Sequence, residues 1–167
     1  MPITAADVKQ LRDETSAGML DCKKALEDAG GDLKKAKEIL NEKGFAAAAK
    51  RSDKETAEGV VHAYVHHNGR VGALVEVNCE SDFVARTDDF KALVAAVALQ
   101  VTGASPLYVS KEDMPEGSED DPKLVCLMEQ EYIKDGSTTM GNMIREAIAK
   151  TGENIRVKRF ARFELGR

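Results

Sequence analysis

Residues 70–79 read RVGALVEVNC, and this stretch decides the fold. Its alternate positions form an unbroken apolar row, made of Val71, Ala73, Val75, Val77 and Cys79. A period of two predicts a β-strand with one buried face. The dipeptide Asn68-Gly69 precedes this strand, and Val60–His67 before it also alternates. We therefore predict a β-hairpin closed by a type I′ turn.

The chain after the hairpin predicts two helices and a last strand. Thr87 is a typical helix N-cap, and apolar residues with helical spacing follow it, namely Phe90, Leu93, Val94, Val97, Ala98 and Val101. A second helix is expected to begin after Thr138 or Thr139, and Asn154–Leu165 is expected to be a strand. This order predicts an α+β fold, with helices packed on one face of a small antiparallel sheet.

The chain before the hairpin has helical spacing instead. Thr4 and Asp7 form a capping pair for a first helix, and Gly30-Gly31 separates a second from a third that begins at Asp32. We expect Gly44 to end the third helix. Three short helices of this kind predict a small bundle.

These patterns divide the chain into three parts. Residues 1–45 are expected to form the three-helix module, and 46–58 a charged linker without a wide apolar stripe. Residues 59–167 are expected to form the α+β core domain. Within it, 104–137 contains three prolines and an acidic cluster, which predicts an irregular surface excursion.

Composition excludes several classes of protein. The net charge of −5 argues against a nucleic-acid binder. We find no signal peptide and no apolar run that predicts a membrane span. The three cysteines form no C-x-x-C pair, so neither a disulfide framework nor a zinc site is expected. We expect a cytoplasmic protein.

We find no set of residues that predicts catalysis. His62 and His66 share one face of a strand but are about 13 Å apart at roughly 3.3 Å per residue, too far to bind one metal ion. The pair Asp88-Asp89 is explained by the dipole at a helix N-terminus. No glycine-rich phosphate loop is present. We therefore expect no enzyme activity, no cofactor and no metal.

The strand-to-helix corner Ser81–Arg86, SDFVAR, is the candidate functional segment. Corners lie on the surface and often carry functional residues. Phe83 either closes the end of the hydrophobic core or contacts another protein. The pattern alone leaves both interpretations open.

Three stretches of the chain resemble elongation factor Ts. They are residues 8–26, with AGM and DCKKAL, residues 74–86, with LVEVNCESDFVAR, and residues 152–166, with GENI and RFELG. They occur in the order found in that family and cover both ends and the centre of the chain. The chain is identified as a member of that family.

The resemblance implies a guanine nucleotide exchange factor for elongation factor Tu. It implies that the N-terminal bundle is a UBA-like module that contacts the partner's GTPase domain through Val8, Leu11, Met19 and Leu20. In the family, the corner inserts its aromatic ring into that domain and disturbs the magnesium site. Here Phe83 would be that ring and Asp82 its polar companion, with Ser81 and Val84 shaping the corner.

The resemblance also implies an assembly. Long members of the family carry two core repeats, whereas only one is present here, and 104–137 is abbreviated. Short members resemble half of a long one and tend to pair, so we expect a homodimer joined through the core sheet. Ser81 replaces the family's usual threonine and keeps the hydroxyl. A pure interaction adaptor, in which the corner is only structural, is the competing interpretation.

Overall fold

The computed structural model describes residues 3–15 and 17–167. The helices are α1 (Ala5–Thr15), α2 (Met19–Asp28), α3 (Leu33–Arg51), α4 (Asp82–Ala85), α5 (Asp88–Ala104), α6 (Pro122–Val125) and α7 (Met140–Thr151). The strands are β1 (Glu58–Val65), β2 (Val71–Cys79), β3 (Glu131–Tyr132), β4 (Asp135–Thr139) and β5 (Ile155–Glu164). Two 3-10 turns, η1 (Lys111–Asp113) and η2 (Leu127–Glu129), lie between α5 and β3.

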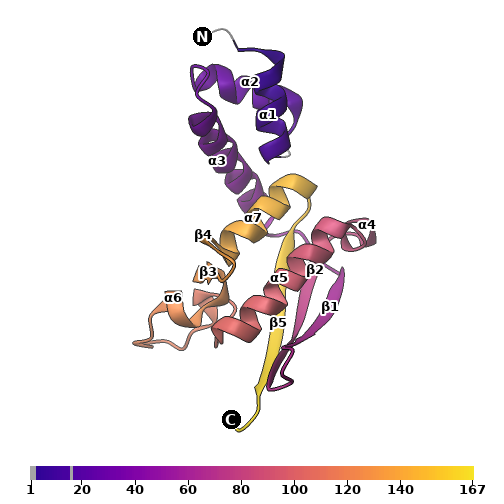
Figure 1. Ribbon diagram of the computed structural model, residues 1–167, viewed down its shortest axis with the longest axis vertical. Coiled ribbons are helices and arrows are strands. Elements are labelled where there is room, and N and C mark those ends of the chain that lie inside the picture. The colour runs from indigo at the N-terminus through magenta and orange to yellow at the C-terminus, as the bar shows by residue number, and fades with distance from the viewer. Residues whose placement is uncertain (1–2, 16) are drawn as a thin grey trace.

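Helices α1, α2 and α3 form the predicted bundle at one end of the molecule (Figure 1). Its core contains Leu11, Cys22, Ala25, Leu26, Ala36 and Leu40. The predicted caps are confirmed. The Asp7 carboxylate accepts from the Thr4 N–H at 2.8 Å, and Asp32 accepts from the N–H groups of Lys34 and Lys35.

The prediction that Gly44 ends the third helix is wrong. Helix α3 continues to Arg51, so it runs from the bundle down to the core domain, where it packs against α7 (Figure 1). A Cβ atom at position 44 would lie 2.9 Å from the Cβ of Ala149, so glycine here permits close packing of the two helices. Ala48, in the segment expected to be a linker, is buried in the main core.

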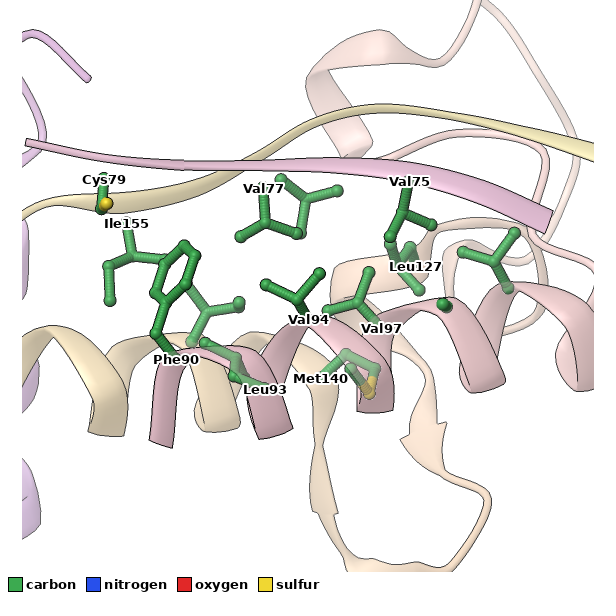
Figure 2. Packing of buried hydrophobic residues seen from close by; sticks show 14 of the residues in the cluster. Val75, Val77, Cys79, Phe90, Leu93, Val94, Val97, Leu127, Met140 and Ile155 are labelled. Atoms are coloured by element: carbon green, nitrogen blue, oxygen red, sulfur yellow. The ribbon is translucent and has the colours of Figure 1, made fainter. Parts of the chain in front are cut away.

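A three-stranded antiparallel sheet forms the core domain, in the order β1-β2-β5. The apolar row of β2 faces α5 and α7, as predicted, and Figure 2 shows Phe90, Val94 and Val97 pointing toward it. Thr87 caps α5 by accepting from the Phe90 N–H, and Thr139 caps α7 by accepting from the Asn142 N–H. The α+β architecture with helices on one face of the sheet is therefore confirmed.

The hairpin is confirmed, but its turn is not of type I′. That turn needs positive φ at both central residues. Of the pair, only Gly69 has one, at 68°. The Gly69 N–H donates to the carbonyl of His66 at 2.7 Å, and Asn68 accepts from the Arg70 N–H through its side chain.

Residues 104–137 are more ordered than an irregular excursion. They contain α6, two 3-10 turns and a two-stranded ribbon, and Leu127 is fully buried in the main core. The buried Gln100 of α5 holds them in place. It donates to the carbonyl of Glu131 and accepts from the N–H of Ile133. Among residues 3–15 and 17–167, no helix is long and apolar enough to cross a membrane.

Candidate functional site

The corner between β2 and α5 is a single helical turn, α4, entered through Ser81. The Ser81 side chain accepts from the Val84 N–H at 3.4 Å, which makes it the N-cap of this turn. Ala85 is buried and Val84 packs against the main core. These inward positions fix the side of α4 that faces the domain.

Phe83 lies on the opposite side of α4 and is 81% exposed. The interpretation that it closes the end of the core is therefore wrong in this structure, because its ring is in solvent. Asp82 beside it forms an ion pair with Arg86, with 3.0 Å between Oδ2 and Nη2. The corner presents an aromatic ring next to a half-exposed carboxylate.

The backbone that leads into the corner is held by Glu153, which follows α7. Its carboxylate accepts hydrogen bonds from the N–H of Glu80 at 3.2 Å, the N–H of Ser81 at 3.0 Å and the hydroxyl of Ser81. From the strand side, the Cys79 thiol donates to the Ser81 carbonyl at 3.1 Å. Burial raises the pKa of that thiol to about 11, so it remains a protonated donor at neutral pH.

A second carboxylate ties the corner to the end of α3. Glu80 accepts from Nε of Arg51 at 3.1 Å and from Nη2 at 2.9 Å, a bidentate pair, and also from the N–H of Asn154 at 2.6 Å. The hydrogen bonds from Arg51 first, and then that from Asn154, lower the pKa of Glu80 below its ordinary value. The Asn154 side chain completes the junction by donating to the carbonyls of Ser52 and Lys54.

The bundle residues named from the sequence are not equally accessible. Leu20 is 83% exposed and Met19 is 59% exposed, side by side at the start of α2. Val8 is half-buried against the bundle core. Leu11 is fully buried in the bundle core, so its side chain cannot itself contact a partner in this conformation.

The described part of the chain offers little for metal or thiol chemistry. Within residues 3–15 and 17–167, no group of three or more His, Cys, Asp or Glu side chains is placed to hold a metal ion. All three cysteines are free and buried. The corner and the start of α2 both expose large apolar side chains, namely Phe83 at the corner and Met19 and Leu20 on α2.

Sequence reasoning missed the residues that hold the corner. Glu153 lies in the GENI stretch and Glu80 in the corner stretch, but neither was assigned a role. Arg51, the partner of Glu80, is 29 positions away along the chain. Ser81, the partner of Glu153, is 72 positions away. No local pattern marks such pairs, and only the packing of α3 and α7 beside the corner brings them together.

Comparison with known proteins identifies the family. The family described as "Elongation factor TS" matches residues 4–123. The chain belongs to the elongation factor Ts family. It is therefore a translation elongation factor, with a role in protein biosynthesis.

Curated elongation factor Ts proteins match almost the whole chain. That of Coprothermobacter proteolyticus is 47% identical, over 99% of this chain and 100% of its own length. That of Moorella thermoacetica is 48% identical, over 98% of this chain and 96% of its own length. That of Thermotoga petrophila is also 48% identical, over 99% of this chain and 98% of its own length.

The alignments are longer than this chain. The first spans 196 positions, against 167 residues here, so at least 29 positions of that elongation factor Ts have no counterpart in this one. The identity nevertheless extends over nearly the full length of both proteins. The chain is thus a compact member of the family.

Proposed function

We propose that this chain is the guanine nucleotide exchange factor for elongation factor Tu and that it acts by inserting Phe83 into the GTPase domain. The observation that carries this proposal is the 81% exposed ring on a short turn whose backbone is anchored at both ends. An exposed aromatic on a held backbone suits an interface hot spot, because little order must be gained on binding.

Exchange by this route needs no bond-breaking chemistry. A GTPase holds GDP through a magnesium ion and a phosphate-binding loop, and small shifts of those elements forfeit strong interactions. A factor that binds the nucleotide-free form more tightly must, by linkage, weaken nucleotide binding by the same ratio. In this proposal Asp82, beside the ring, contacts polar groups at the same site.

The second contact surface in this proposal is the start of α2. Met19 and Leu20 are adjacent, large, apolar and exposed, and such residues are favoured in the centre of an interface. Val8 packs against the bundle core and Leu11 lies within that core. The surface would add affinity while the corner acts on the nucleotide site.

The first test is Phe83→Ala in a labelled-GDP release assay with elongation factor Tu. Truncation of a hot-spot ring costs about 2 kcal/mol or more, so release should slow by about thirtyfold. Because the ring is exposed, the free energy of unfolding should change by no more than about 0.5 kcal/mol.

Leu124→Ala is the matched control, because Leu124 is 69% exposed and lies in α6, outside the proposed contacts. It should leave release unchanged. Normal exchange by Phe83→Ala would rule out the wedge and favour an adaptor whose corner is only structural.

We also infer that two copies of the chain pair through the uncovered face of the core sheet. Three-residue rows cross this face, Val65–Gly72–Phe163 and Ala63–Leu74–Ala161 among them. Phe163 is 77% exposed and Val65 is 65% exposed. The other end of the same face carries the Glu76–Arg159 ion pair, so only the end with Val65 and Phe163 is apolar. A sheet face that meets water normally carries polar residues, so this apolar end favours a covering partner.

A further inference from the structure

The Glu153 carboxylate accepts three hydrogen bonds, all of them from the entrance of the corner. Its donors are the N–H groups of Glu80 and Ser81 and the Ser81 hydroxyl, two consecutive residues at the entrance of the corner. The acceptor itself lies in the turn between α7 and β5. These bonds therefore continue the pairing of β2 with β5, which ends at Cys79 and Ile155, into the corner.

The bond to the hydroxyl also orients the cap of α4. A hydroxyl has one proton, and Ser81 gives it to Glu153, so a lone pair is left to face the Val84 N–H. A helix of one turn fixes several dihedral angles for very few hydrogen bonds, so α4 depends on such outside anchors. Removing the carboxylate takes away the acceptor of the Glu80 and Ser81 N–H groups and of the capping hydroxyl.

Phe83 does little to fix its own direction, because most of its ring is in solvent. Val84 and Ala85 hold the far end of the turn against the core. The near end is held by the contacts of Glu153, together with the Cys79 thiol and the Glu80–Arg51 pair. The direction of the ring is thus set by its backbone.

We propose that Glu153 is a positioning residue for nucleotide exchange: it holds Ser81 and the first turn of α4 so that Phe83 is presented in one direction. This inference rests on the proposed function of the corner. Its physical effect is preorganisation, because a corner already ordered in the free protein loses less entropy when it inserts into a partner.

The chain contains no tryptophan, so Phe83→Trp places a single fluorescent reporter on the corner. In the free protein, adding Glu153→Ala should lower the slowly decaying part of the reporter's fluorescence anisotropy. In the protein without the reporter, Glu153→Ala should slow GDP release from elongation factor Tu about tenfold, which corresponds to the ordering of one or two residues. Glu153→Gln keeps one acceptor oxygen. Its anisotropy and its rate of GDP release should therefore both lie between those of Glu153→Ala and those of the protein with Glu153.

Asp113→Ala is the matched control. Asp113 accepts from the N–H and the hydroxyl of Ser110, both at 3.0 Å, which is the same chemistry at a different serine cap. It lies in η1, away from the corner. It should change neither the anisotropy of the tryptophan reporter nor GDP release.

The outcomes separate this inference from the function on which it rests. If Phe83→Ala exchanges normally, the proposed wedge fails, while the anisotropy still reports whether Glu153 holds the corner. If Phe83→Ala slows release but Glu153→Ala changes neither the anisotropy nor release, the positioning role is overturned. A lower melting temperature with unchanged anisotropy of the reporter also overturns it. Should Glu153→Ala fail to fold, Glu153→Gln decides by the same criteria.

Discussion

Phe83 is exposed because of the geometry of a single turn. Val84 and Ala85 form the inward face of α4 and pack on the core, so position 83 of the same turn is left on the outside. The hydrophobicity of the ring would favour burial, by about 1.5–3 kcal/mol for a side chain of this size. The backbone held at Ser81 prevents it from turning inward.

At the same corner, Glu80 makes stability depend on pH. The pKa of Glu80 is lowered in the folded protein from its ordinary value near 4.5, mainly by the hydrogen bonds from Arg51. The ionised carboxylate therefore stabilises the fold fully at pH values above about 4.5, and this stabilisation is lost as the pH falls through the lowered pKa. In Glu80→Gln, the side chain at this position has no group that titrates. The melting temperature of the natural protein should exceed that of Glu80→Gln at pH 6 to 7, and the gap should shrink as the pH falls below about 4.5.

The measurement is a set of thermal melts of both proteins from pH 7 to pH 3. A gap that stays constant, or widens toward acid, would show that the charge on Glu80 does not stabilise the fold. Gln keeps a carbonyl oxygen that can accept from the Asn154 N–H, so the variant tests the charge more than the backbone contact.

Among the elements, α3 departs most from the prediction. Glycine commonly ends a helix, and this led to the expected stop at Gly44. The structure uses this glycine differently, since the absence of a side chain lets α3 approach α7 at Ala149. The same helix therefore has its first half in the bundle core, at Ala36 and Leu40, and its second half in the main core, at Ala48.

Exchanging the two small residues tests this crossing. Gly44→Ala should gain helix propensity but force the helices apart, and Ala149→Gly should remove the clash that it creates. The propensity terms are additive and cancel in a double-mutant cycle. We expect a coupling free energy of about 1–2 kcal/mol, in which the second change rescues the first.

Urea or thermal unfolding of the two single variants, the double variant and the natural protein gives this coupling. Strict additivity would show that α3 and α7 do not meet at these positions in solution. It would also restore the earlier interpretation of 46–58 as a linker that does not pack on the core.

In the whole molecule, α3 connects the two surfaces proposed to contact elongation factor Tu. The bundle lies at one end of this helix (Figure 1). Arg51, the last residue of the helix, is paired with Glu80 beside the corner. A helix packed at both ends sets the position of the bundle relative to Phe83 more firmly than a flexible linker would. The proposal that both surfaces contact one partner therefore requires that partner to fit the fixed arrangement of the bundle and the corner.

The proposed homodimer is also a property of the whole molecule. Phe163→Glu places a charge at the apolar end of the uncovered sheet face, and burying an unpaired charge is strongly unfavourable. Sedimentation equilibrium should give twice the chain mass of 18.1 kDa for the natural protein and the single mass for Phe163→Glu. Leu124→Glu, at a similarly exposed apolar site in α6, should remain dimeric.

A natural protein that sediments as a monomer and exchanges nucleotide at the full rate would rule out a required dimer. If both glutamate variants are monomeric, a surface other than the sheet is responsible.

Local patterns in the sequence determined the hairpin, the caps at Asp32 and Thr87, the α+β class and the family, because each depends on residues that are close together in the chain. The direction of Phe83, the continuation of α3 to Arg51 and the order within 104–137 were decided only in the tertiary structure. Each depends on distant partners, such as Glu153 for Ser81, and their contacts outweigh local preferences. A period of two or 3.6 states which face is buried, but the neighbour that buries it is set by the packing of the whole chain.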